Sequence, residues 1–389
     1  MPFLSLVSTA GDANQALAEL RAQARGGWNG AVDVALVFFT PQHLGAVENI
    51  AKAISEFKPR ALLGCPGETI IGNDREFEGG PALCLWLGRW AQPINVTPFH
   101  LAIEQTSEGC SLLGWPDELV DAPPTESLLL TVADPFTFPT DDFLGQINDE
   151  KPGLRVVGGM ASGAREPGQH RLILGERVLL EGAAGVLLQG PIACRSVVSQ
   201  GCRPIGKPLV ITKARDNIIH ELGGKPALAQ LQQLWQELPP RDQQLVQQGL
   251  HVGRVINEYQ AAFQRGDFLV RNVIGIERGT GAVAITDRVR VGQTIQFHVR
   301  DAASADDDLR MLLQQDARAN AAKPQGALIF SCNGRGTRLF QQPNHDAAAI
   351  QKEMGPLPLA GFFAQGELGP IGGQNFIHGF TASVALFEG

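Results

Sequence analysis

The chain has 389 residues, a net charge of −8 and a 44% share of hydrophobic residues, which is the composition of a globular protein long enough for two domains. No basic patch with interleaved aromatic residues is present, and no apolar run approaches the ~18 residues of a membrane span. We therefore expect neither nucleic acid nor a membrane among the partners of this protein.

The cysteine pattern argues against a disulfide framework and against a zinc site. No two cysteines have CxxC spacing, and the histidines do not complete a zinc pattern. The N-terminus lacks the basic and apolar segments of a signal peptide. We expect reduced thiols in a cytoplasmic protein without a metal or a cofactor. The six cysteines are Cys65, Cys84, Cys110, Cys194, Cys202 and Cys332.

The first part of the chain predicts alternating helices and strands. An amphipathic helix is expected over 12–25, where Asp12 can accept hydrogen bonds from the first turn. The elements expected after it are a strand at 32–39, a helix at 43–57, a strand at 61–64, a glycine turn at 65–68 and a strand at 82–87.

The same order of elements recurs twice. The second copy has strands at 127–133, 155–157 and 184–189 with a helix at 141–148. The third has strands at 327–331, 359–363 and 378–387 with a helix at 345–354. Such a unit favours two parallel strands joined by a helix, with the third strand added antiparallel. The predicted fold class is therefore mixed α/β, or α+β, with mixed sheets built from repeated strand–helix–strand–strand units and helices packed outside.

A different segment separates the second and third copies. We expect a turn-rich connection at 200–211, helices at 226–238 and 241–248, strands at 252–256, 268–276, 282–285 and 294–299, and a helix at 304–319 that begins at Ser304. The absence of a low-complexity linker predicts two closely packed halves, residues 1–195 and 196–389.

Two glycine-rich turns near the C-terminus stand where strands end. The turn at 332–336 contains Arg335, and the turn at 365–370 contains Glu367. Because parallel strands expose their carboxyl ends at one edge of a sheet, we expect the two turns to be neighbours. A guanidinium and a carboxylate there would complement the two charges of a free amino acid.

These C-terminal motifs resemble the C-terminal half of the FIST family. The matching residues are SCNGRG at 331–336, PLAGFFAQGELGP at 358–370 and HGFTASVALF at 378–387, and DVALVFFTPQH at 33–43 matches the N-terminal half. The resemblance implies a two-part FIST module, a sensory domain for small molecules such as amino acids in bacterial signalling proteins. The family also contains F-box substrate receptors, and no enzymatic activity is firmly attached to it.

Each candidate ligand-binding residue has a structural alternative. Cys332 is a reactive thiol or a buried core residue, and Arg335 binds an anion or pairs with an acid such as Glu367. Arg203 faces a cleft or holds a loop in place. The full candidate set is Cys332, Asn333, Arg335, Gln365, Glu367, Asn375, His378, Arg203 and Glu68.

Three functions are compatible with these features. The first is a sensory module that binds a small polar metabolite between its halves and signals through a protein partner. The second is an enzyme that uses Cys332 as a nucleophile, for which the sequence assigns no base. The third is a protein-interaction adaptor; the FIST-like pattern begins too near the N-terminus to leave room for a preceding F-box.

Overall fold

The computed structural model describes residues 2–28, 30–106, 109–260 and 262–389. It consists of two compact units: unit 1 contains residues 1–198 and 309–389, and unit 2 contains residues 199–308. No helix in the described part of the chain is both long and apolar enough to cross a membrane. Because residues 199–308 lie between the two segments of unit 1, unit 2 is an insertion in the sequence of unit 1.

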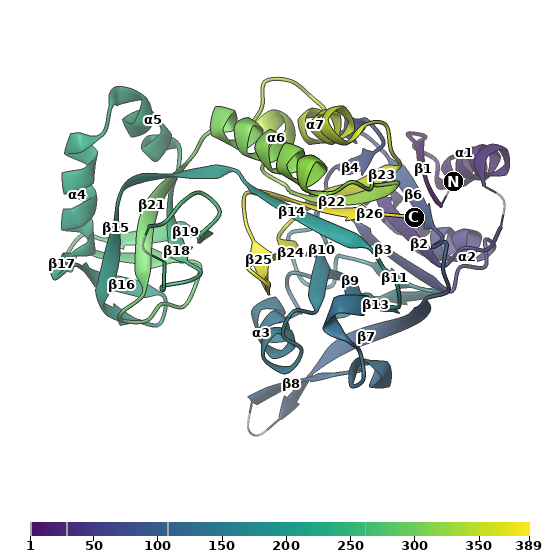
Figure 1. Cartoon of the computed structure of the whole chain (residues 1–389), viewed down its shortest axis with the longest axis horizontal. Coiled ribbons are helices and arrows are strands. Elements are labelled where there is room, and N and C mark those ends of the chain that lie inside the picture. Colours follow the sequence, from purple (N-terminus) through teal and green to yellow (C-terminus); the bar gives the residue numbers. More distant parts are fainter. Residues whose placement is uncertain (1, 29, 107–108, 261) are drawn as a thin grey trace. The chain divides into compact units, whose positions relative to one another are not determined.

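All three predicted repeats are present in unit 1 (Figure 1). In each repeat the first two strands of the predicted unit are parallel and the last lies antiparallel beside the first, while a further, leading strand lies beside the last. Repeat 1 contains β1 (Phe3–Ser8), β2 (Val34–Phe39), α2 (Val47–Ser55), β3 (Ala61–Pro66) and β6 (Leu83–Gly88). Repeat 2 contains β7 (Asn95–Thr106), β9 (Ser127–Ala133), α3 (Thr140–Glu150), β10 (Arg155–Met160) and β13 (Ala183–Gln189). Repeat 3 contains β14 (Cys194–Gln200), β22 (Gly326–Cys332), α7 (His345–Met354), β23 (Leu359–Ala364) and β26 (Thr381–Phe387).

Each repeat also contributes a short hairpin to the sheet of another repeat. The hairpin β4 (Ile70–Gly72)–β5 (Arg75–Phe77) of repeat 1 pairs with β23 of repeat 3. The hairpin β24 (Glu367–Ile371)–β25 (Gln374–His378) of repeat 3 pairs with β10 of repeat 2, and β11 (Leu172–Leu174)–β12 (Arg177–Leu179) of repeat 2 pairs with β3 of repeat 1. This cyclic exchange joins the three repeats into one body.

A glycine in the second strand of each repeat permits the close pairing with the first strand. A Cβ atom on Gly361 would lie 1.7 Å from the carbonyl oxygen of Ile329, which no side chain can tolerate. A Cβ atom added to Gly158 would likewise lie 1.8 Å from the carbonyl oxygen of Thr131, and one added to Gly64 would lie 2.6 Å from that of Val37. The shared glycine is thus a sequence signature of the repeat.

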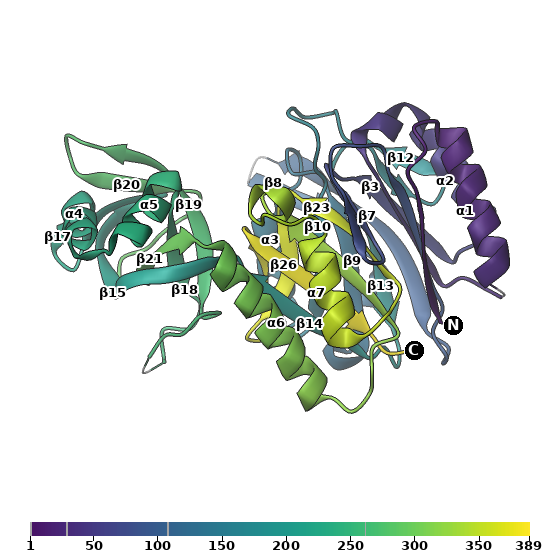
Figure 2. The same cartoon turned by 90° about the horizontal axis from the view of Figure 1, so that it is seen from above.

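The three sheets of unit 1 bury their inner faces in one common core. Phe38 of repeat 1 packs on Phe330 and Phe362 of repeat 3, with ring centroids 6.4 and 5.1 Å away, and Leu130 and Val157 of repeat 2 belong to the same cluster. Helices cover the outer faces: α1 (Ala13–Gly27) with α2, α3, and α7 with the C-terminal part of α6 (Ala302–Ala319) (Figure 2). Sheets covered on both faces account for strands that are apolar throughout.

Unit 2 is a closed β-barrel. Its strands follow the order β15-β21-β18-β19-β20-β16, and β15 also pairs with β16, which closes the ring. The strands are β15 (Cys202–Arg215), β16 (Ile218–Leu222), β18 (Leu250–Val255), β19 (Phe268–Glu277), β20 (Ala282–Ile285) and β21 (Thr294–Arg300), with β17 (Lys225–Pro226) beside β16. The predicted helices are confirmed as α4 (Ala227–Glu237) and α5 (Pro240–Gln248).

Two expectations for this segment are wrong. The turn-rich connection expected at 200–211 lies mostly in the long strand β15, because the turn residues around Gly206 form an irregularity between Ile205 and Leu209 instead of ending the strand. The helix expected to begin at Ser304 begins at Ala302, and Asp301 caps it by accepting from the amide nitrogens of Ala303 and Ser304 at 3.1 and 3.3 Å.

The compact units also differ from the two sequence halves 1–195 and 196–389. The chain enters unit 2 after Val198, close to that division, but it returns to unit 1 at Leu309 to form repeat 3. The boundary predicted from the sequence corresponds to the single point where the chain passes from unit 1 into unit 2. An inserted unit has a second boundary, where the chain passes back into unit 1.

Candidate functional site

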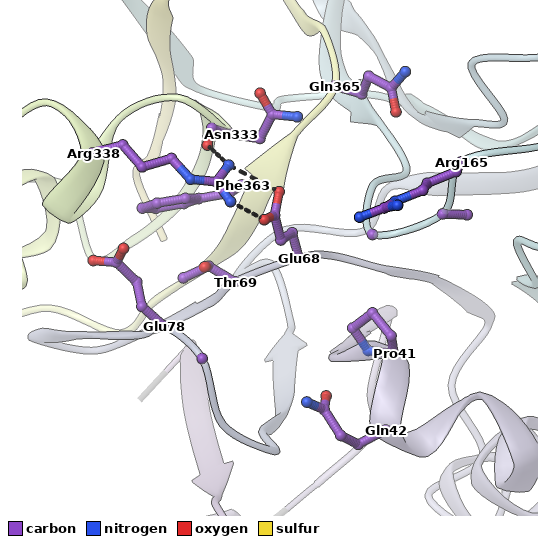
Figure 3. Close-up of a pocket in the computed structure, with 13 residues that line it drawn as sticks. Pro41, Gln42, Glu68, Thr69, Glu78, Arg165, Asn333, Arg338, Phe363 and Gln365 are labelled. Atoms are coloured by element: carbon purple, nitrogen blue, oxygen red, sulfur yellow. Dashed lines mark hydrogen bonds and ion pairs between the residues drawn. The ribbon is translucent and has the colours of Figure 1, made fainter.

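A pocket of about 510 Å³ lies where all three repeats of unit 1 meet (Figure 3). Its volume is within the range of roughly 300–1,000 Å³ that is usual for small-molecule sites. We call it the three-repeat pocket. Its lining residues are Pro41, Gln42, Glu68, Thr69, Glu78 and Gly79 of repeat 1, Gly163, Ala164 and Arg165 of repeat 2, and Asn333, Arg338, Phe363 and Gln365 of repeat 3.

The pocket lies at the carboxyl ends of the parallel strand pairs. Pro41 follows β2, Glu68 follows β3, Asn333 follows β22 and Gln365 follows β23. Parallel strands end at the same edge of a sheet, which is the usual place for a ligand in open α/β sheets. The three repeats thus bring their turn residues to one place.

Ser162 ties the three repeats together next to the pocket. Its side chain is buried, and its hydroxyl accepts a hydrogen bond from the backbone nitrogen of Glu68 at 2.8 Å and donates one to the carbonyl oxygen of Phe363. The Ser162 backbone nitrogen also donates to the carbonyl oxygen of Pro66 at 3.2 Å. One serine of repeat 2 therefore holds the turn after β3 of repeat 1 and the end of β23 of repeat 3.

An ion pair between repeats 1 and 3 crosses the pocket. The guanidinium of Arg338 binds the carboxylate of Glu68 with both terminal nitrogens and donates to the carbonyl oxygen of Asn333 at 2.7 Å (Figure 3). The Glu68 carboxylate raises the pKa of Arg338 by this hydrogen bonding and by charge attraction. The side chains of Arg338 and Glu68 are 57% and 35% exposed, so solvent reaches the pair.

The other charged side chains of the pocket are Glu78 and Arg165. The Glu78 carboxylate accepts three hydrogen bonds from Thr337, two from the backbone nitrogen at 3.0 and 3.2 Å and one from the hydroxyl at 2.6 Å. Arg165 lies on the exposed loop after β10 and extends toward Glu68 (Figure 3). The pocket therefore presents acidic, basic and amide groups around one space.

The structure places Arg335 in a buried ion pair outside the pocket lining. Its side chain is fully buried, and it donates to the two carboxylate oxygens of Asp346 at 2.7 Å each. Its guanidinium also lies 5.2 Å from the ring centre of Phe340. The sequence offered Glu367 as the structural partner of Arg335, but the structure pairs it with Asp346, eleven positions along the chain at the start of α7. The geometry assigns Arg335 to the stability of repeat 3.

Glu76 belongs to the same buried cluster. Its carboxyl group accepts from the backbone nitrogens of Asp346 and Ala347 at 2.8 and 3.1 Å, and so caps α7 from the hairpin of repeat 1. Burial, together with the nearby Asp346 carboxylate, raises the pKa of Glu76 to about 8. The pKa of Asp346 is lowered, since Arg335 and His345 outweigh the effect of burial.

Three further candidates of the C-terminal motif are buried structural residues. Glu367 accepts from the Thr381 hydroxyl at 2.7 Å, and His378 contacts the carbonyl oxygen of Gly369 at 2.9 Å. Asn375 accepts from the backbone nitrogen of Val156 at 2.8 Å and so helps to fix the exchanged hairpin on repeat 2. None of these three lines the three-repeat pocket.

Cys332 and Arg203 also lie outside the pocket lining. Cys332 is buried at the end of β22, with Sγ 3.9 Å from the side-chain oxygen of its neighbour Asn333. Arg203 lies on β15 in unit 2 and binds the carboxylates of Asp242 and Asp301. Five of the six cysteines are free thiols, and the side chain of Cys110 lies outside the described residues.

The pocket thus contains three of the nine candidates, Glu68, Asn333 and Gln365, and several residues that the sequence analysis missed. Arg338 stands only three positions after Arg335, and the pattern does not tell which of the two arginines is exposed. Arg165 lies in an exposed loop and Glu78 at a half-buried loop position, and neither stretch of sequence carries a motif. The repeat itself was a usable signal, because it predicts that the turn after β10 joins the turns after β3 and β23.

Two family models match this chain, the FIST N domain over residues 33–225 and the FIST C domain over residues 227–370. The chain belongs to the FIST family. It is 42% identical over 383 residues to an uncharacterized protein of Mycobacterium tuberculosis, which covers 98% of both chains. An uncharacterized protein of Mycobacterium bovis is 41% identical over 98% of this chain and 97% of its own.

The family halves cut across the compact units of this FIST protein. The FIST N domain includes β15 and β16 of the barrel, and the FIST C domain includes the remaining barrel strands and β22 and β23 of repeat 3. The three-repeat pocket is lined from both family matches, by residues 41–165 and 333–365.

Proposed function

We propose that this FIST protein is a sensory module that binds a small polar metabolite, such as an amino acid, in the three-repeat pocket. FIST domains are generally sensory modules of signal transduction. The observation that carries the proposal is the pocket itself: charged and amide side chains from three repeats surround one space at the carboxyl ends of the strands.

Binding in this pocket would couple the three repeats. A ligand that contacts Gln42, Arg165 and Asn333 would bridge turns of three repeats that already share a common core and exchange hairpins. A ligand that binds only the folded state stabilises it by an amount that grows with the logarithm of the ligand concentration once that concentration exceeds Kd. We propose that the bound state is passed to a partner protein in the cytoplasm, and the free thiols support a reducing compartment.

A cysteine-based enzyme receives less support from the geometry. Cys332 is buried and does not line the pocket, whereas a nucleophile must reach the substrate. We expect iodoacetamide to modify Cys332 at neutral pH no faster than it modifies the buried Cys65. Rapid modification of Cys332 in the native protein would instead support the hypothesis that Cys332 is a catalytic nucleophile.

The proposal is tested by thermal unfolding of the purified protein against a library of amino acids and related metabolites. A matched pair of variants on one loop locates the site. Ala164→Trp fills the pocket, and Glu166→Trp adds the same side chain two positions further on, at an exposed residue that does not line it. A ligand that stabilises the wild type and Glu166→Trp but not Ala164→Trp supports the proposal. A library without any stabilising compound contradicts it.

A further inference from the structure

The four charged side chains that line the three-repeat pocket differ in whether the protein itself supplies a partner for their charge. The lining contains two glutamates, Glu68 and Glu78, and two arginines, Arg165 and Arg338. The remaining polar lining side chains are uncharged. A charged side chain that has no partner in the protein therefore indicates the opposite charge on the ligand.

Three of the four charges have partners within the protein. Glu68 and Arg338 neutralise each other, and Arg338 uses a further N–H on the carbonyl oxygen of Asn333. Glu78 makes no ion pair among the described residues, although its charge helps to raise the pKa of Arg338, and its two oxygens accept three hydrogen bonds from Thr337. Hydrogen bonds to a carboxylate stabilise its charged form without a counter-ion.

Arg165 is the remaining charge. Its guanidinium makes no ion pair within the described part of the chain, although it extends toward Glu68 (Figure 3). The backbone holds it in this place: Gly163 has φ +94°, and a Cβ atom there would lie 2.6 Å from Pro41 and 3.6 Å from the Cα of Glu68. The loop after β10 is thus pressed against repeat 1, and Arg165 follows two positions later.

We infer that the ligand of the three-repeat pocket carries a single carboxylate that is bound by the guanidinium of Arg165. This inference rests on the proposed function and names the class of ligand. A guanidinium binds a carboxylate through two parallel charge-assisted hydrogen bonds. The amides of Gln42, Asn333 and Gln365 then supply donors and acceptors for hydroxyl, amino or amide groups of the ligand.

A dianionic head group fits the same site less well. A phosphate monoester carries about −1.5 to −2 charges at neutral pH, and one free guanidinium cannot balance them. The carboxylates of Glu68 and Glu78 would face the excess charge across the pocket. A lone cation fits less well too, because both carboxylates already have hydrogen-bond donors.

The test uses a set of compounds in which one group changes at a time. On each of three skeletons, those of alanine, leucine and phenylalanine, we compare the amino acid, its amide, the 2-hydroxy acid and the hydroxy amide, with glycerol 3-phosphate as the dianion. Affinities are measured by calorimetry on the full chain. We expect both acids of a skeleton to bind roughly 10- to 100-fold more tightly than their amides, which lack the charge-assisted contact.

Variants identify the residue that recognises the carboxylate. Arg165→Ala should remove the preference for acids over amides, Arg165→Lys should retain part of it, and Arg278→Ala, at an exposed position of unit 2, should change nothing. Glu68→Gln should strengthen binding of the hydroxy acids several-fold, because it releases Arg338 from its ion pair.

The outcomes separate this inference from the proposed function. Equal affinity for acids and amides, an undiminished preference in Arg165→Ala, weaker hydroxy acid binding in Glu68→Gln, or tighter binding of the phosphate ester would overturn the carboxylate inference and leave a binding module. No binding by any compound, including the metabolite library above, would overturn both.

Discussion

At the scale of single residues, the two arginines of the SCNGRG turn region have opposite roles. Arg335 is fully buried against Asp346, whereas Arg338 is half exposed and pairs with Glu68 across the pocket. They are three positions apart: Arg335 directly precedes the short helical turn Gly336–Arg338, and Arg338 is its last residue. The difference is one of burial, which is decided by packing and not by the local sequence.

We therefore predict a large difference in stability between two alanine variants. Arg335→Ala leaves the Asp346 carboxylate buried without its counter-ion, which typically costs ~3–5 kcal/mol. Arg338→Ala removes a solvent-exposed ion pair, which is worth ~0–1 kcal/mol. Urea unfolding of both variants measures the difference. Equal stability of the two would show that the Arg335–Asp346 pair does not support the fold.

The buried Glu76 gives repeat 3 a dependence on pH. Its pKa is raised from 4.5 to about 8 in the folded state, so the folded protein holds this proton where the unfolded chain has lost it. The stability that Glu76 contributes is thus complete below pH ~4.5 and is lost as pH rises through about 8. Glu76→Gln keeps an oxygen acceptor for the amides of α7 but cannot ionise.

We expect the urea midpoint of Glu76→Gln, measured relative to that of the wild type, to be higher at pH 8.5 than at pH 5. Glu104→Gln, at an exposed acid of unit 1, serves as the control. An identical pH dependence of the wild type and Glu76→Gln would mean that Glu76 is ionised throughout.

At the scale of elements, the hairpin exchange depends on the glycine of each second strand. Gly361 on β23 faces the Ile329 carbonyl oxygen, and β23 also accepts the hairpin of repeat 1. Gly361→Ala should therefore displace β23 and destabilise unit 1 by roughly 1–3 kcal/mol, as overpacking does. Gly379→Ala, where no atom lies within 4 Å of the added Cβ, should have little effect. Thermal unfolding compares the two; similar melting temperatures would contradict the close pairing.

The elements also show how far the sequence predicts this fold. The parallel pairs and their helices were predictable, because apolar strands of six or seven residues alternate with amphipathic helices. The exchanged strands β4, β5, β11 and β12 have three residues each, which is too short for a periodic pattern. Their partners lie in other repeats, and pairing at such a distance along the chain has no local signal.

The candidate site was predictable to a smaller extent for the same reason. Glu68 and Gln365 were found because each follows a second strand, and the repeat places these turns together. Arg165 follows the equivalent strand of repeat 2, but it stands in an exposed loop of small and polar residues. In the sequence, the charges of Arg335 and Glu367 indicated a ligand-binding site. In the structure, each of these side chains instead binds a buried partner in its own repeat.

At the scale of the whole molecule, the two units contain different titratable groups. In unit 2, burial lowers the pKa of His251 and of His298 to about 4, and the two residues are paired on adjacent strands of the barrel. In unit 1, burial lowers the pKa of His43 and raises the pKa of Glu76. Mild acidification therefore reduces the stability that His43 contributes to unit 1 and increases the stability that Glu76 contributes.

We predict that unit 2 loses stability first when the pH falls. An unfolded histidine takes up a proton near pH 6.5, but the two barrel histidines stay neutral until about pH 4. Their contribution is complete above pH ~6.5 and is lost progressively toward pH 4, at about 1.4 kcal/mol per pKa unit for each. Hydrogen exchange with mass spectrometry, corrected for the intrinsic effect of pH, should show peptides from 199–308 losing protection between pH 7 and 5 before those of unit 1. His298→Asn, which does not titrate in this range, should reduce the pH dependence of unit 2 while leaving that of unit 1 unchanged. Loss of protection in both units at the same pH, in the wild type and in the variant alike, would show that the barrel histidines do not govern the acid response.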